Sequence, residues 1–115
     1  MLRELSHRIE AQVRASDVAA RYGGEEFVII LPDTNTEDGA RLAERIRLAI
    51  SERPVELPNG DTTDITVSIG IAGIQPPRDD RDLKTLGDSL IARADVALYS
   101  AKSAGRDRVL VENAA

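Results

Sequence analysis

The sequence Gly23-Gly24-Glu25-Glu26-Phe27 interrupts a largely apolar stretch of the chain. Adjacent glycines supply the positive φ angles of a tight turn, so this stretch is predicted to form a β-hairpin with strands over 17–21 and 26–31. Two acids follow the glycines directly, and carboxylates beside a bare backbone suit a divalent metal ion and a nucleotide phosphate. For an isolated sequence of this kind a solvated turn would be the more ordinary interpretation. The choice between a metal and phosphate site and a solvated turn therefore depends on the rest of the chain.

The remaining pattern predicts an α+β domain, with an antiparallel sheet and helices on one face. Apolar residues at helical or alternating spacing and turn residues between them define the elements. The predicted elements are an amphipathic helix ending near Ala15, a helix over 37–51 capped by Thr36, a small hairpin around Pro58-Asn59-Gly60, a strand over 65–72, a helix from Asp88 or Ser89 to about Ala104, and a strand over 108–111. Residues 76–82 are predicted to form a surface loop, and 112–115 a frayed tail.

The predicted strand over 65–72 has one bulky and one small face. Its small face consists of Thr66, Ser68, Gly70 and Ala72. Small residues allow close approach of either a packed helix or a ligand, and packing is the more ordinary interpretation.

Composition narrows the classes of function. The chain has 115 residues, enough for one domain with a modest core. Its net charge of −5 disfavours general nucleic-acid binding, and the absence of cysteine excludes disulfides and thiolate metal sites. Its longest apolar runs are too short to span a bilayer, so no membrane contact is expected from this segment and a cytoplasmic setting is predicted.

Several segments together resemble the GGDEF family of diguanylate cyclases, of the response-regulator type. They occur in family order over almost the whole chain: Arg21-Tyr22 and the Gly-Gly-Glu-Glu-Phe turn, 43–47, 66–72 and 94–106. The resemblance implies a bacterial signalling enzyme that condenses two GTP molecules into cyclic di-GMP. It also implies a ferredoxin-like palm of the nucleotidyl cyclase type.

The resemblance covers the C-terminal portion of such a domain. Residues 1–115 are expected to form a partial GGDEF domain, without the opening strand–helix unit that carries a metal-binding aspartate and the polar residues that read guanine. The chain alone is therefore expected to turn over GTP poorly, because phosphoryl transfer is sensitive to lost charge and geometry.

The resemblance assigns roles at the hairpin. Glu25 would ligate Mg²⁺ or Mn²⁺, and Gly23 and Gly24 would let the backbone lie against the nucleotide. Three roles are open to Glu26: completing the metal site, assisting deprotonation of the attacking hydroxyl, or shaping the turn. The family name has Asp where Glu25 stands, which is a charge-preserving variant.

A second set of residues would bind the GTP triphosphate. The resemblance assigns this role to Lys102 and Arg106, which are four residues apart at the end of the last predicted helix. Cations at a helix C-terminus also complement the helix dipole, which is the structural alternative. Asp107 stands where asparagine is more usual and adds a negative charge beside Arg106.

The resemblance also implies an allosteric product site. Arg14 and Asp17 have the spacing of the family's inhibitory site, and Arg45 matches a third member. Arginine would donate a bidentate pair of hydrogen bonds to a guanine edge or phosphate of cyclic di-GMP, and aspartate would accept hydrogen bonds from guanine. Catalysis would need a second GGDEF domain in a homodimer, since two GTP-loaded sites must meet. The alternative function is a non-catalytic cyclic di-GMP receptor that uses the same three residues.

Overall fold

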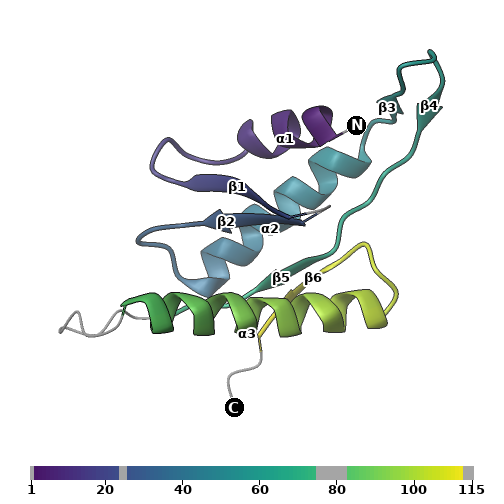
Figure 1. Ribbon diagram of the computed structural model, residues 1–115. Helices are drawn as coiled ribbons and strands as arrows, with labels where there is room; N and C mark the ends of the chain where they lie inside the picture. Colours follow the sequence, from purple (N-terminus) through teal and green to yellow (C-terminus); the bar gives the residue numbers. More distant parts are fainter. Residues whose placement is uncertain (1, 24–25, 75–82, 113–115) are drawn as a thin grey trace.

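The computed structural model describes residues 2–23, 26–74 and 83–112. Over these ranges the chain forms three helices and six strands, and the strands pair into three separate two-stranded sheets. The prediction of an α+β domain is confirmed, whereas the prediction of one antiparallel sheet is wrong (Figure 1).

In Figure 1, helix α2 (Thr36–Ser51) lies behind the hairpin, and it supplies half of the buried apolar residues in the described ranges. Its apolar residues recur at helical spacing, so they share one face that packs inward. The buried core combines Ile9 of helix α1 with Leu42, Ile46 and Ile50 of α2. The N-cap is Asn35, whose side chain accepts a hydrogen bond from the Asp38 N–H at 2.8 Å. The predicted cap at Thr36 is therefore one residue too late, because asparagine satisfies the free N–H groups at this helix start.

Helix α1 (Leu2–Glu10) ends before the predicted boundary near Ala15. The chain turns where Gln12 N–H bonds the Ile9 carbonyl, and the Arg14 N–H donates to Asp17 Oδ2 at 2.8 Å instead of to a helical carbonyl. Aspartate side chains compete with the helix for backbone N–H groups in this way.

Strands β1 (Val18–Gly23) and β2 (Glu26–Ile30) form the predicted hairpin. Their ladder is antiparallel, with an irregularity between Arg21 and Gly23. Phe27 is partly buried against the core cluster, so its ring contributes to packing. The opposite face of the hairpin is open, with Val18 and Ile30 both exposed.

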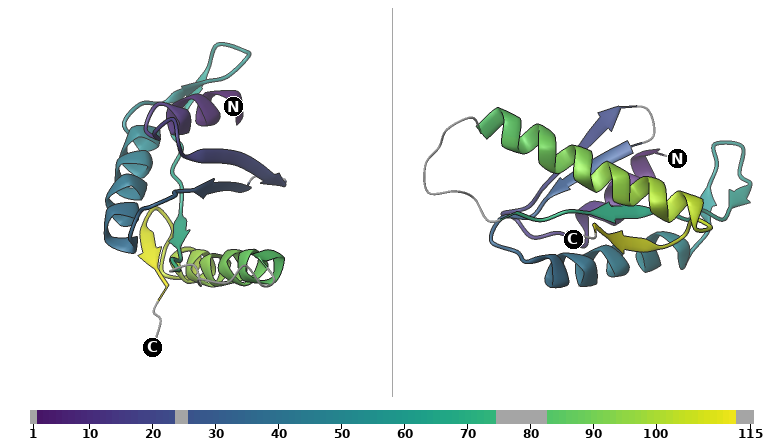
Figure 2. Two further views of the ribbon diagram at one scale, coloured as in Figure 1. Left: turned by 90° about the vertical axis from the view of Figure 1, so that its left-hand side faces the viewer. Right: turned by 90° about the horizontal axis from the view of Figure 1, so that it is seen from below.

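Strand β5 (Ile69–Ile71) pairs with β6 (Val109–Val111) in parallel, between helices α2 and α3. The two helices cover opposite faces of this ladder, which corrects the prediction of helices on one face (Figure 2). Gly70 lies against α3: a Cβ built on it would be 2.2 Å from the Leu98 nitrogen. The small face of the strand therefore serves helix packing at this position. The strand is shorter than predicted because only 69–71 have a ladder partner among the described residues.

Helix α3 (Leu83–Ser103) begins before the predicted Asp88 or Ser89, and the Lys84–Asp88 ion pair at 3.0 Å supports its first turns. Gly105 follows it with φ +126°, a positive angle that glycine adopts freely at a helix C-terminus. The predicted small hairpin is present as β3 (Val55–Glu56) and β4 (Thr62–Thr63). Glu112 is not frayed, because its N–H donates to the Ile71 carbonyl at 2.7 Å and its carboxylate pairs with Arg93.

The predicted surface loop over 76–82 lies outside the described residues. Of the helices that are described, none combines the length and apolarity needed to cross a membrane.

Candidate functional site

The hairpin tip carries the predicted catalytic residues. Gly23 ends β1 and pairs with Glu26, which begins β2 with an exposed side chain. Gly24 and Glu25 lie outside the described residues. In the ranges that are described, no group of three or more His, Cys, Asp or Glu side chains is placed to hold a metal ion. The predicted metal role of Glu25 thus remains a prediction.

Arg14 and Asp17 form a closed unit in the turn between α1 and β1. Asp17 Oδ1 accepts from Arg14 Nη2 at 3.2 Å, and Oδ2 accepts from the Arg14 backbone N–H at 2.8 Å. The Asp17 side chain has no exposed surface, whereas the Arg14 side chain is 58% exposed. The side-chain hydrogen bond from Arg14, followed by its backbone bond, lowers the pKa of Asp17, since both favour the carboxylate. In this arrangement Asp17 orients Arg14, and Arg14 faces solvent.

The Arg14 guanidinium is further fixed from the end of β2. Its Nη2 also donates to the Pro32 carbonyl at 3.1 Å and to Thr34 Oγ1 at 2.7 Å. A guanidinium held by several acceptors keeps one orientation. Because Nε and Nη2 already donate within the protein, the N–H groups of Nη1 are the ones that would donate to a base edge or phosphate.

Arg14 and Arg45 line the same pocket, a cavity of about 240 Å³ between the α1–β1 turn and the start of α2. Arg45 reaches across it and donates to the Gln12 carbonyl at 3.4 Å. The remaining lining residues are Gln12, Asp33, Thr34, Asp38 and Leu42. The structure thus brings together the two arginines that the sequence predicted for the inhibitory site, while Asp17 lies behind Arg14.

Sequence reasoning missed the carboxylates of this pocket. Asp38 lies in the first turn of α2, where acids are common because they complement the helix dipole, so its residue type alone gives no functional signal. It stands seven positions before Arg45, which is about two helical turns, so both side chains lie on one face of α2. That spacing could have indicated the site.

Lys102 and Arg106 both have exposed side chains at the end of α3. The helix stops at Ser103, so the two residues do not share a helical face as their spacing suggested. Arg106 instead lies on the turn beyond the helix, with φ +65°. Neither residue lines the Arg14 pocket.

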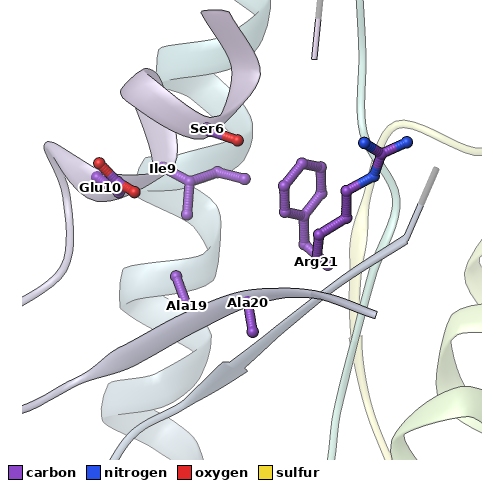
Figure 3. Close-up of a pocket in the computed structure, with 7 residues that line it drawn as sticks. Ser6, Ile9, Glu10, Ala19, Ala20 and Arg21 are labelled. Carbon is purple, nitrogen blue, oxygen red and sulfur yellow. The ribbon is translucent and has the colours of Figure 1, made fainter. Parts of the chain in front are cut away.

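A second hollow of about 180 Å³ lies between α1 and β1. Figure 3 shows Ser6, Ile9 and Glu10 of α1 across from Ala19 and Arg21 of β1. It combines polar and apolar lining without a convergent set of like charges, and sequence reasoning assigned it no role.

Comparison with known proteins agrees with the order of motifs in the chain. Residues 1–108 match the family described as diguanylate cyclase, GGDEF domain. Response regulator PleD of Caulobacter vibrioides is 40% identical over 111 residues, covering 96% of this chain and 23% of PleD. Diguanylate cyclase DgcP of Pseudomonas aeruginosa is also 40% identical over 111 residues, covering 96% of this chain and 15% of DgcP. The chain therefore spans less than a quarter of the length of these two relatives.

Solved structures share the fold. The GGDEF domain of DgcB from Caulobacter crescentus, crystallised in complex with c-di-GMP, has a TM-score of 0.82 and 35% identity, over 96% of this chain and 61% of that one. The active GGEEF domain of a diguanylate cyclase from Vibrio cholerae has a TM-score of 0.78 and 28% identity, over 99% of this chain and 67% of that one. On the family match and the identity to these relatives, the chain belongs to the GGDEF family of diguanylate cyclases.

Proposed function

We propose that the protein carrying this chain condenses two GTP molecules into cyclic di-GMP, and that the pocket of Arg14 and Arg45 binds the product. The observation that carries the proposal is the convergence of these two arginines, from different elements, on one cavity of about 240 Å³. Arginine forks pair with the acceptor edge of guanine or with phosphate oxygens. A GGDEF relative, DgcB, crystallised with c-di-GMP.

The carboxylates of the pocket complement the arginines. Guanine presents N–H donors beside its acceptor edge. Asp38 Oδ1 accepts from Arg41, and the second oxygen of this carboxylate would be an acceptor for guanine on the same wall as Arg45. Asp17 is engaged by Arg14, so its part is to hold that guanidinium toward the ligand; direct contact of Asp17 with guanine would require Arg14 to release it.

The hairpin tip supplies the catalytic part of the proposal. Carboxylate oxygens are the ligands that Mg²⁺ and Mn²⁺ prefer, so the acids Glu25 and Glu26 fit such an ion. When bound, the ion would neutralise charge that develops on the α-phosphate. Glu26 is exposed at the first position of β2, where a substrate could reach it. The Vibrio cholerae relative is an active domain with a GGEEF motif, which supports glutamate as a functional variant.

Two bound nucleotides must meet for this reaction, so the proposed partner is a second GGDEF domain in a homodimer. Each domain would contribute one GTP, held in part by Lys102 and Arg106 of its own chain. Positioning two substrates in one geometry accounts for a large share of catalysis in reactions of this type.

Product binding is tested by calorimetry with cyclic di-GMP on the 115-residue chain. We expect Arg14→Ala and Arg45→Ala each to weaken binding about tenfold or more, because a charge-assisted hydrogen bond contributes about 1.5–3 kcal/mol. Arg3→Ala, which removes an exposed arginine of α1, is the matched control and should leave the affinity unchanged. Equal affinities of all four proteins would contradict the assignment of the pocket.

Catalysis is tested separately in the whole protein that carries this chain. Glu25→Ala should abolish conversion of GTP to cyclic di-GMP while leaving product binding at the Arg14 pocket intact. Turnover that persists in this variant would remove Glu25 from the metal site. A wild-type protein that binds cyclic di-GMP and makes none would instead support the receptor alternative.

A further inference from the structure

The turn after α3 has an unusual backbone. Three successive residues, Gly105, Arg106 and Asp107, have positive φ angles of 126°, 65° and 48°. Glycine adopts this region freely, whereas the two larger residues are held there against a steric preference for negative φ. Such a conformation persists only where surrounding contacts stabilise it. The hydrogen bonds and ion pairs of this turn therefore show which residues hold it in place.

The backbone of the turn is fixed to the end of α3. The Arg106 N–H donates to the Ala101 carbonyl at 3.0 Å and the Gly105 N–H to the Lys102 carbonyl at 3.3 Å, the pair of bonds that defines a Schellman motif. These two bonds fix the backbone of Arg106 relative to the last turn of α3, which carries Lys102.

Asp107 joins this turn to two other elements. Its N–H donates to Ser68 Oγ at 3.2 Å, just before β5, and its Oδ1 accepts from Arg47 Nη1 of α2 at 2.8 Å. Arg47 is itself held by Glu44, whose two carboxylate oxygens each accept from Nε at 3.1 Å. The Arg47 side chain is only 19% exposed. A bridge between α2 and the α3 turn thus runs through one arginine.

The charges of this bridge are well defined. The hydrogen bonds that Arg47 donates to Glu44 and then to Asp107 raise the pKa of Arg47 further above its usual range, and the bond accepted from Arg47 lowers the pKa of Glu44. Arg47 and Glu44 are therefore ionised at neutral pH, and the Arg47 guanidinium pairs with both the Glu44 and the Asp107 carboxylates. Without Arg47, the Asp107 carboxylate would lose its hydrogen bond to α2, and it could then pair with Arg106 or repel a phosphate.

We infer that Arg47 is a positioning residue for triphosphate binding: it pairs with the Asp107 carboxylate on the side of α2 and holds the turn, so that Asp107 does not pair with the positive charge of Lys102 and Arg106. The inference rests on the proposed function, in which these two residues bind the phosphates of GTP. It also accounts for the tolerance of an aspartate beside a phosphate-binding arginine.

The test is an NMR titration of the chain with GTP and with GMP, following backbone amides of 100–108 so that weak binding is measured. We expect Arg47→Gln to weaken GTP binding about fivefold or more, with less than about a twofold change for GMP, which lacks the β- and γ-phosphates. The double variant Arg47→Gln/Asp107→Asn should return to within about twofold of the wild type, because it also removes the carboxylate charge that Arg47 holds away from Arg106.

The rescue distinguishes this role from a merely structural one. If Arg47 only braced the turn, removing the second partner would not restore GTP affinity. Arg3→Gln is the control for the loss of one positive charge. Unchanged GTP affinity in Arg47→Gln, or failure of the double variant to recover, would overturn the inference. Unchanged affinity in Lys102→Gln/Arg106→Gln, or no GTP binding by the wild type, would overturn the phosphate-binding role and the inference with it.

Discussion

At the scale of single residues, Asp17 is held by several hydrogen bonds from one neighbour. Arg14 contacts it through the backbone N–H, Nε and Nη2. These bonds favour the carboxylate over the protonated acid, which is why the pKa of Asp17 is lowered.

The lowered pKa predicts a pH dependence of stability. A carboxyl whose pKa is lower in the folded state contributes stability above its unfolded pKa of about 3.9 and loses it as pH falls through the folded value. The Asp17→Asn variant should therefore be less stable than the wild type at neutral pH, and the difference should shrink as pH falls below about 4. Urea denaturation at several pH values measures it. A difference that is constant with pH would show that the charge of Asp17 is not the cause.

Some residues at and behind the Arg14 pocket were predicted from the sequence, and others were not. Arg14, Asp17 and Arg45 were predicted only through resemblance to a family, since an Arg-x-x-Asp spacing alone has no specificity. Thr34 and Asp38 were not predicted, because the pocket forms only where the β2–α2 connection folds back beside the α1–β1 turn. That long-range contact leaves no local pattern in the sequence beyond the seven-residue spacing of Asp38 and Arg45 on α2.

At the scale of elements, the packing of β5 on α3 depends on Gly70. An added Cβ would lie 2.2 Å from the Leu98 nitrogen and 2.3 Å from the Ala94 carbonyl oxygen, both backbone atoms of α3 that cannot rotate away. Gly70→Ala should therefore destabilise the fold by about 2 kcal/mol or more, as expected for overpacking against a rigid neighbour.

Gly87 provides the matched control. It lies inside α3, and a Cβ there would meet nothing within 4 Å. Gly87→Ala should stabilise the fold by about 0.5–1 kcal/mol, because alanine favours the helix and restricts the unfolded chain. Thermal or urea unfolding of the two variants decides the matter. Destabilisation by both would show that the free space around each glycine does not set the sign of the effect.

Arg8 connects two helices. It is 7% exposed, and its guanidinium donates to the carbonyls of Ile50 at 2.7 Å, Arg53 at 2.8 Å and Pro54 at 3.2 Å, at and beyond the last turn of α2. The last carbonyls of a helix have no N–H donor within the helix. The Arg8 side chain supplies donors to the carbonyls at the end of α2 and just beyond it.

Replacing Arg8 by methionine keeps much of the side-chain volume and removes the donors. We expect Arg8→Met to lower the free energy of unfolding by about 2–4 kcal/mol, since buried carbonyls would lose their partners. Arg3→Met, at an exposed position of the same helix, should change it by less than about 0.5 kcal/mol. Similar effects of the two substitutions in urea unfolding would show that the contacts of Arg8 are not responsible.

Element types were predictable from local pattern, and their ends and pairing were not. The apolar stripe of α2 and the Gly-Gly turn identified a helix and a hairpin because both signals are local. The early end of α1 depends on Asp17, and the parallel pairing of β5 with β6 depends on contacts between segments far apart in the sequence.

At the scale of the whole molecule, β2 and β5 belong to different two-stranded sheets. They do not pair: β2 bonds only β1 and β5 bonds only β6 among the described residues, and Figure 2 shows the hairpin and the β5–β6 ladder as separate units. Each strand thus has one edge without a ladder partner in the part of the chain that the structure describes. Strand edges of this kind recruit other strands.

This arrangement predicts association of the isolated chain. Size-exclusion chromatography with light scattering should show a mass that rises above the monomer value as concentration increases, and a charged substitution at the exposed end of β2, Ile30→Lys, should reduce the rise. A monomer at every concentration tested would show that these edges are covered in solution.

Occupation of the pocket of Arg14 and Arg45 by cyclic di-GMP is the main proposal for this molecule, and chemical-shift mapping by NMR is its sharpest test. Titration of the chain with cyclic di-GMP should shift the signals of the residues that line the pocket: Gln12, Arg14, Asp33, Thr34, Asp38, Leu42 and Arg45. Signals of the α3 turn around Arg106 should stay in place. Shifts confined to that turn, or no shifts at saturating ligand, would contradict the proposal.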